Sequence, residues 1–252
     1  MSTAHGQYSP ADAAAMLRWI GEAGVDTIVE ESPTDWSLAP KAAKPVAEKA
    51  APHGIAQPQA SYRATPAASS SLQQAAQAET IAAGCNTLED LRAAMEQFDG
   101  CALKRTAQQL VFADGPSDAN LMLIGEAPGR DEDITGLPFV GAAGQLLNKI
   151  LSAAGSARET SYITNLVPWR PPGNRKPTPL EMQICLPFLK RHIALKAPKV
   201  IVLLGATPVS ALFATTDGIT RLRGRWRELG GIGETAIPTM PTFHPAYLLR
   251  QP

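Results

Sequence analysis

The chain has 252 residues, with 23 Lys or Arg and 23 Asp or Glu, so its formal net charge is zero. This length suffices for one domain of ordinary size with additional segments. The N-terminus lacks the basic and apolar regions of a signal peptide, and no apolar run reaches the roughly 20 residues that a membrane-spanning helix needs. We therefore expect a cytoplasmic protein without a membrane partner.

The charges are divided unevenly along the chain. Residues 1–100 carry 6 basic and 12 acidic side chains, whereas residues 149–252 carry 14 basic and 5 acidic ones. A basic C-terminal half is typical of a protein that contacts a polyanion, although an ordinary solvated surface can give the same pattern.

The first 80 residues differ in composition from the rest. Residues 9–24 have the apolar spacing of a short amphipathic helix, and residues 1–36 are assigned to an N-terminal helical segment. Residues 37–80 are rich in Ala, Pro, Ser and Gln, so a disordered linker is predicted there. The N-terminal helix is then either a tethered accessory or a segment docked on the main domain at residues 81–252.

In this main domain, short apolar strands alternate with helices. Helices are predicted at 88–98, 141–154, 179–195 and 206–214, and strands at 120–124, 161–165, 199–204 and 236–243. Thr87 and Asp90 resemble a capping box at the start of the first of these helices. Because such alternation produces parallel sheets covered on both faces, we predict a three-layer α/β/α domain with a mainly parallel four-stranded sheet.

Polar residues follow the ends of the predicted strands. Gly125 and Glu126 come directly after the first strand, Asn165 ends the second, and His244 follows the last. In open parallel sheets, ligands bind beyond the carboxyl ends of the strands. A glycine-rich start of a helix beside Phe139 can also hold a phosphate. Together these residues predict a site for a base attached to a sugar-phosphate, although each of them alone could be structural.

Longer motifs carry a resemblance to one family. They are residues 125–129 (GEAPG) with 132–133, residues 136–141 (GLPFVG), residues 164–175, and residues 244–250 (HPAYLLR). Over about residues 88–252 the chain resembles the family 4 uracil-DNA glycosylases, which flip uracil out of DNA and hydrolyse its bond to deoxyribose. The resemblance implies a bacterial base-excision-repair enzyme that acts as a monomer at the nucleoid on uracil in single- or double-stranded DNA.

The resemblance also implies which residues bind the base. Phe139 would stack on the flipped uracil, and Asn165 would pair with its Watson–Crick edge through the side-chain amide. Gly125 and Ala127 would complete the substrate pocket. The alternative for Phe139 is a place in the hydrophobic core.

Three further residues would carry the reaction. His244 would donate a hydrogen bond to the uracil oxygen that becomes negative as the bond breaks. Glu126 and Glu132 are the candidates for stabilising the sugar cation and orienting water, and the sequence does not rank them. Asp133 is predicted to be structural.

Contacts to DNA are expected from glycines and from basic residues. The predicted set is Gly129, Gly141 and Gly144, which allow close backbone approach to phosphate, and Arg175, Arg223, Arg225 and Arg250. Leu248, four residues after His244, is the predicted wedge that fills the vacated base stack. The basic run at 221–225 could equally be a solvated turn.

Family 4 enzymes hold a [4Fe–4S] cluster on four cysteines, and this chain keeps part of that ligand set. Cys101 and Cys185 match two ligand positions, whereas Phe98 and Trp169 occupy the other two. Because neither of these side chains ligates iron, the sequence predicts no cluster and no metal site. Cys85 is a poor substitute, since it lies sixteen residues before Cys101.

Other functions remain open at this point. One is a catalytically weak module that binds DNA lesions, and the complete set of pocket residues argues against it. A related group of glycosylases captures its abasic product through a histidine, but residues 173–178 (GNRKPT) contain none. A hydrolase of small nucleotides is disfavoured by the basic C-terminal half.

Overall fold

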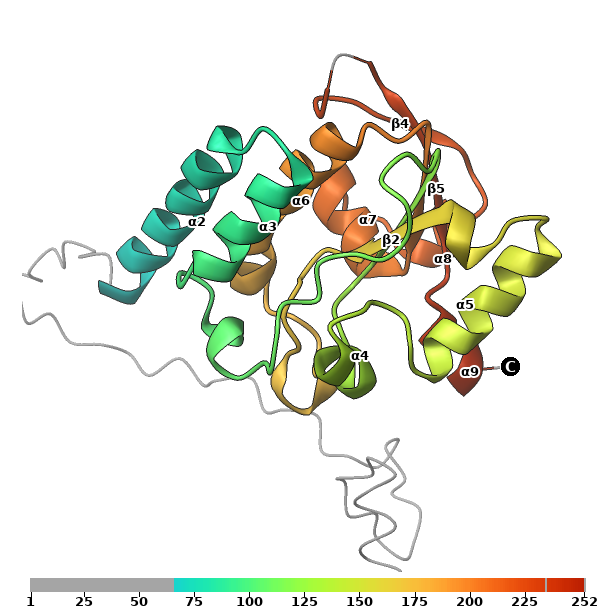
Figure 1. The fold of residues 1–252 in the computed structure, drawn as a ribbon, viewed down its shortest axis with the longest axis horizontal. Coiled ribbons are helices and arrows are strands. Elements are labelled where there is room, and N and C mark those ends of the chain that lie inside the picture. Colours follow the sequence, from blue (N-terminus) through green and yellow to red (C-terminus); the bar gives the residue numbers. More distant parts are fainter. Residues whose placement is uncertain (1–65, 234, 252) are drawn as a thin grey trace, which may run out of the picture. The chain divides into compact units, whose positions relative to one another are not determined.

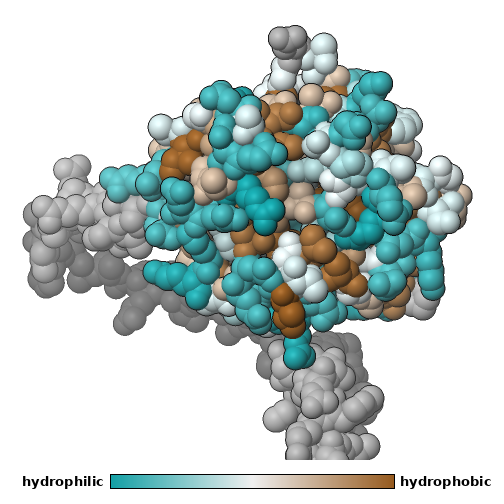
Figure 2. All heavy atoms as spheres, in the orientation of Figure 1, coloured by the Kyte–Doolittle hydropathy of each residue, from teal (hydrophilic) through white to brown (hydrophobic). Residues whose placement is uncertain are grey.

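The computed structural model describes residues 66–233 and 235–251 (Figure 1). The predicted helix at 9–24 and residues 37–65 of the predicted linker lie outside the described residues. Among the helices that are described, none is long and apolar enough to cross a membrane. Figure 2 shows a face on which hydrophilic residues surround small, separate groups of hydrophobic ones.

A five-stranded sheet forms the centre of the described domain, with the strand order β2-β1-β3-β5-β4. Strands β1 (Leu121–Gly125), β2 (Ser161–Asn165), β3 (Val200–Leu204) and β5 (Ile237–Thr242) are parallel, as predicted. Strand β4 (Arg227–Leu229) pairs antiparallel with β5 at one edge. The prediction of four strands was therefore wrong, because it missed this edge strand. Of its three residues only Leu229 is buried.

Helices cover both faces of this sheet. On one face, Met122 and Ile124 of β1 share a core with α3 (Leu88–Gln97), α6 (Pro179–Lys196) and α7 (Ala206–Phe213). On the other face, Leu123 packs against Leu147 and Leu151 of α5 (Ala142–Ala153). The remaining short elements are α4 (Arg130–Thr135), α8 (Ile219–Leu222), α9 (Pro245–Arg250), and the 3-10 turns η2 (Ala102–Arg105), η3 (Arg158–Thr160) and η4 (Pro172–Asn174). The predicted three-layer arrangement is present (Figure 1).

Helix α2 (Pro66–Gly84) occupies part of the segment predicted to be a linker. It lies against α6, and its Ala78 and Ala82 are 0% and 2% exposed. Alanine is the strongest helix former, and its small side chain lets two helices approach closely. The linker prediction is therefore wrong for residues 66–80, because an Ala- and Gln-rich composition also suits a helix that packs on a neighbour.

A polar network lies inside the core between α6 and β2. The Nε2 atom of His192 is 2.8 Å from the hydroxyl oxygen of Tyr162, and the imidazole stacks on the Phe112 ring at 4.4 Å. Burial lowers the pKa of His192 to about 3. The imidazole is therefore neutral in the folded protein at every pH well above 3.

This buried imidazole should make stability depend on pH. Below its ordinary pKa of about 6.5, His192 binds a proton in the unfolded chain but not in the folded one. Its contribution should therefore lower the free energy of unfolding by about 1.4 kcal/mol per pH unit as the pH falls below 6.5. Urea unfolding at pH 7.0, 6.0 and 5.0 measures this slope.

The variant His192→Gln provides the control for this slope. It keeps a polar group near Tyr162 but cannot titrate, so its slope should be smaller than that of the unchanged protein. Any contribution from His244 is common to both proteins and cancels in the comparison. Equal slopes in the two proteins would contradict the assignment.

Candidate active site

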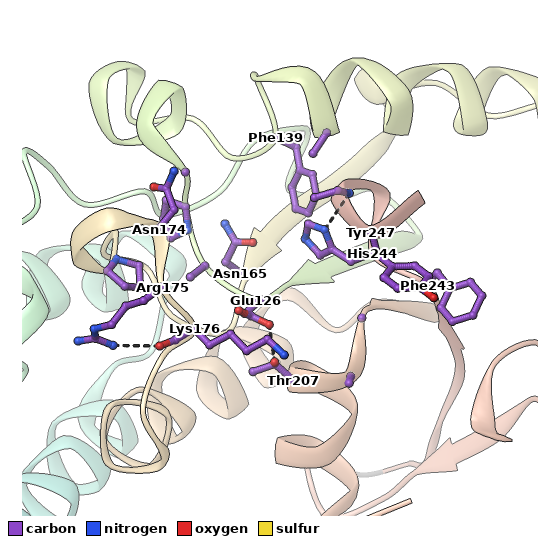
Figure 3. Close-up of a pocket in the computed structure, with 18 of the residues that line it drawn as sticks. Glu126, Phe139, Asn165, Asn174, Arg175, Lys176, Thr207, Phe243, His244 and Tyr247 are labelled. Carbon is purple, nitrogen blue, oxygen red and sulfur yellow. Dashed lines mark hydrogen bonds between the residues drawn. The ribbon is translucent and has the colours of Figure 1, made fainter. Parts of the chain in front are cut away.

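A cavity of about 660 Å³ lies at the carboxyl edge of the sheet (Figure 3). Glu126, Phe139, Asn165 and His244 all line it; Glu126 follows β1, Asn165 is the last residue of β2, and His244 follows β5. Ala127, Gly129 and Glu132 line the same cavity. The strand-end pattern in the sequence thus identified side chains that the fold brings together.

Gly125 allows the side chains of Asn165 and Phe139 to pack closely against the backbone of β1. It pairs in register with Asn165 across β1 and β2. A Cβ atom on Gly125 would lie 2.4 Å from Asn165 Oδ1 and 2.6 Å from Cζ of Phe139, far inside van der Waals contact. The absence of a side chain at Gly125 therefore lets the aromatic ring and the amide lie side by side.

The Asn165 amide has an unused hydrogen-bonding atom. The side chain is 5% exposed, and its Oδ1 accepts no hydrogen bond from any residue that the structure describes. An unpaired buried polar atom costs about 1–3 kcal/mol. Because this amide also lines the cavity, it is suited to a ligand that supplies the missing donor.

His244 is held in one tautomer. Its Nδ1 accepts a hydrogen bond from the backbone N–H of Ala246 at 3.1 Å, so in the neutral imidazole the proton is on Nε2. Burial lowers the pKa of His244, with Arg250 also lowering it and Glu126 opposing the shift. The imidazole stacks beside the Phe139 ring at 5.5 Å. The site therefore contains a neutral histidine that can donate from Nε2.

The two candidate carboxylates differ in their contacts. One oxygen of Glu132 accepts from the backbone N–H groups of Val140 and Gly141, both at 2.9 Å, and the other from Gly129 N–H at 3.0 Å. Both oxygens of Glu132 are thus engaged in holding the loop that carries Phe139. This favours a structural role for Glu132.

Glu126 is less constrained. One of its oxygens, Oε2, accepts a hydrogen bond from the Thr207 hydroxyl, and its carboxylate lines the cavity (Figure 3). Its backbone carbonyl accepts from Val167 N–H at 3.0 Å, which fixes the start of the side chain. Glu126 therefore offers a carboxylate oxygen to the cavity from a rigid backbone.

Arg158 holds the backbone on which Phe139 is placed. Phe139 has a φ of 54°, in the left-handed region that a bulky residue rarely adopts. The guanidinium donates to the carbonyls of Phe139 and Pro138 at 2.8 and 2.6 Å, and it pairs with Asp114. Arg158 thus stabilises an unfavourable conformation beside the cavity.

Loss of the Arg158 hydrogen bonds should slow a reaction that depends on the position of Phe139. For Arg158→Ala we expect kcat/KM for the reaction that the sequence resemblance implies to fall about 10- to 100-fold, since small displacements at a reacting site have effects of this size. Arg158→Lys, which can still reach one carbonyl, should recover part of the loss. Thermal melting checks that the Ala variant is folded. Unchanged kcat/KM in a folded variant would rule out a positioning role for Arg158.

The predicted DNA contacts fall into two groups. Gly144 is buried, and a Cβ on it would lie 1.8 Å from the Phe139 carbonyl oxygen, so the absence of a side chain there lets α5 pack closely against the Phe139 backbone. Arg175 makes a bidentate pair with Glu181 at 2.7 and 2.9 Å, although it also lines the cavity. Because of these contacts, Gly144 and Arg175 are less available to DNA than the other predicted residues.

The other predicted contacts lie nearer the surface. Gly141 is partly exposed, Arg225 and Arg250 are exposed, and Arg250 lines the cavity. The Arg223 guanidinium lies over the Phe243 ring, with 4.4 Å between its Cζ and the ring centroid. Leu248 is partly buried on α9 and is not among the residues that line the cavity.

The ligand positions expected for an iron–sulfur cluster lie in the core. Cys101 and Cys185 are 0% and 1% exposed, and the neighbouring Cys185 thiol lowers the pKa of Cys101. Phe98 and Trp169 belong to the same hydrophobic cluster. Over residues 66–233 and 235–251, no three His, Cys, Asp or Glu side chains form a group that could hold a metal ion. A four-thiolate cubane does not fit this donor set, since the whole chain has three cysteines.

Sequence reasoning missed two residues of the site. Thr207 follows Gly205 at the end of β3, so the strand-end rule could have found it. Arg158 precedes β2 and reaches the site across the fold, and no local pattern in the sequence marks it.

Comparisons with known proteins agree with the geometry of the site. The sequence model described as "Uracil DNA glycosylase superfamily" matches residues 112–252. A type-4 uracil-DNA glycosylase of Thermotoga maritima is 43% identical over 163 residues, which cover 62% of this chain and 80% of that protein. The type-4 uracil-DNA glycosylase of Archaeoglobus fulgidus is 38% identical over 170 residues, covering 66% and 85%. The chain therefore belongs to the type-4 uracil-DNA glycosylases, within the uracil-DNA glycosylase superfamily.

Proposed function

We propose that this protein hydrolyses the N-glycosidic bond between uracil and deoxyribose in DNA, leaving an abasic site for base excision repair. The observation that carries the proposal is the buried Asn165 Oδ1, which accepts no hydrogen bond from the residues that the structure describes, on a side chain that lines a cavity together with Phe139, His244 and Glu126. The substrate is uracil in DNA, and the enzyme acts as a monomer in the cytoplasm at the nucleoid.

Recognition of the base depends on a fixed amide. Uracil presents an N–H donor and a carbonyl acceptor side by side, and the Asn165 amide offers the complementary pair. Cytosine reverses these two groups, so it would leave Asn165 mispaired, at a cost of about 1–3 kcal/mol. Phe139 stacks on the base, which contributes about 1–3 kcal/mol and offsets part of the cost of flipping.

Bond cleavage separates charge. The electron pair of the C1′–N1 bond leaves with uracil, which becomes an anion, while the sugar becomes a cation. The His244 Nε2–H donates to the uracil oxygen on which the negative charge develops. A neutral imidazole suits this role because its Nδ1 is already occupied by the Ala246 N–H.

The carboxylate of Glu126 completes the reaction. Its negative charge stabilises the sugar cation, and its other oxygen, Oε1, orients a water molecule toward C1′. The water oxygen bonds to C1′ and its proton passes to the carboxylate, which then releases it to solvent while the uracil anion takes up a proton. The products are uracil and an abasic deoxyribose. Thr207 keeps Oε2 in place while this happens.

The chain is an atypical member of its family, in our proposal, because it folds without an iron–sulfur cluster. Phe98 packs edge-on against Phe188 at 5.1 Å, and Trp169 is 2% exposed, so both aromatics fill core volume near Cys101 and Cys185. The purified protein should be colourless and should contain far less than one iron per chain by elemental analysis. Stoichiometric iron would overturn this part of the proposal.

Uracil release from defined oligonucleotides tests the activity. The protein should convert uracil in single- and double-stranded DNA to abasic sites that alkali cleaves, and it should leave cytosine untouched. A module that only binds lesions would retain the oligonucleotide without cleavage. A glycosylase that captures its product would instead give a protein–DNA adduct on a denaturing gel. Either of these last two results would contradict simple hydrolysis.

A further inference from the structure

A stack of one guanidinium and two aromatic rings lies at one side of the active-site cavity. Phe243, at the end of β5, is the middle member: Arg223 covers it at 4.4 Å, and the Tyr247 ring lies 5.0 Å away at an angle of 38°. Phe243 and Tyr247 both line the cavity, and Tyr247 is 39% exposed. Figure 3 shows this pair beyond His244, on the side away from Asn165.

The proposed reaction uses only part of this cavity. Its volume of about 660 Å³ falls in the range of sites that enclose a drug-sized ligand, and a single pyrimidine base is much smaller. Glu126, Phe139 and Asn165 account for the uracil itself. The part lined by Phe243, Tyr247, Ile219 and Thr220 has no role in the chemistry derived above.

The composition of this part points to a nucleobase. Aromatic rings bind bases of unpaired nucleic acid by stacking, and this attraction is tolerant of sequence because every base has a flat face. An arginine over the far side of the stack adds positive charge close to the DNA backbone. An ordinary core contact would bury the outermost ring, whereas Tyr247 is 39% exposed.

We propose that Tyr247, supported by Phe243 and Arg223, stacks on the nucleobase adjacent to the flipped uridine. This inference rests on the proposed function and names the form of substrate that the same site prefers. In a duplex the adjacent base is already stacked and paired, so it must give up those contacts to reach Tyr247. In a single strand it is free to do so, and the enzyme should therefore favour uracil in unpaired DNA.

The test is a double-mutant cycle in which one change is made in the protein and the other in the DNA substrate. The substrates are a single-stranded oligonucleotide with one uracil, the same oligonucleotide in a duplex, and two single-stranded copies in which the nucleotide on one or the other side is replaced by a tetrahydrofuran residue that lacks a base. With the unchanged protein, one of these replacements should lower kcat/KM about 5- to 150-fold, the range expected for one base–aromatic stack.

Three variants complete the cycle. Tyr247→Ala should lose most of this sensitivity to the missing base, whereas Tyr247→Phe, which keeps the ring, should retain it. Leu249→Ala is the matched control, because Leu249 is a 49%-exposed apolar residue on the same helix, α9. It should behave as the unchanged protein does, and thermal melting should show all three variants folded.

Two results would overturn the proposal. One is a Tyr247→Ala protein that remains as sensitive to the missing base as the unchanged protein, which would make the aromatic stack a packing feature. The other is a larger loss on duplex than on single-stranded DNA, which would make Tyr247 a wedge that enters the base stack. Failure of the unchanged protein to excise uracil from any of these substrates would instead refute the proposed function itself.

Discussion

Replacing Glu126 with glutamine should lower kcat for uracil excision by about 10²–10⁴-fold, the range typical of a carboxylate that handles a proton in the transition state. The glutamine has nearly the same shape and can still contact Thr207, but it carries no charge to stabilise the sugar cation and accepts no proton. Affinity for uracil-containing DNA should change only a few-fold. Single-turnover kinetics and equilibrium binding on the same oligonucleotide separate the two quantities.

The matched comparison is Glu132→Gln. Glu132 accepts three backbone hydrogen bonds, and a glutamine amide can accept only on its oxygen side. At least one part-buried N–H would then lose its partner, at a cost of about 1–3 kcal/mol in stability. We expect a lower melting temperature and a smaller loss of kcat than for Glu126→Gln. The reverse ranking would assign the chemistry to Glu132.

His244→Ala should lower kcat by about 10²–10³-fold, since it removes a fixed donor to the developing uracil anion. The buried setting of His244 lowers its pKa, so the neutral form persists below pH 6.5. The single-turnover rate of the unchanged protein should therefore not begin to fall at pH 6.5 on account of this group. A decline centred at or above pH 6.5 that His244→Ala abolishes would indicate a protonated donor instead.

The positions of the pocket residues were predictable because they depend on one simple rule. Parallel strands end at the same edge of a sheet, so Glu126, Asn165 and His244 converge although they are far apart in the sequence. The capping box of Thr87 and Asp90 was predictable for a similar reason, since its two hydrogen bonds of 3.0 Å are local.

Features that depend on contacts across the fold were not predictable. Helix α2 has the composition of a linker, and it becomes recognisable as part of the domain only by packing against α6. The side chain of Arg158 reaches the Phe139 backbone from nineteen residues away along the chain. The proposed preference for Glu126 over Glu132 also depends on the structure, because both follow β1 and they differ in hydrogen bonds and in burial.

The pocket of Glu126, Asn165 and His244 is proposed to remove uracil in a chain whose three cysteines are too few for a four-cysteine cluster. The most direct measurement is the single-turnover rate of uracil excision per chain, taken together with the iron content of the same preparations. We predict full excision at a rate that does not vary with iron content, and no excision by Glu126→Gln on the same time scale. An excision rate that rises in proportion to bound iron, or iron-free protein that excises no uracil, would contradict this proposal.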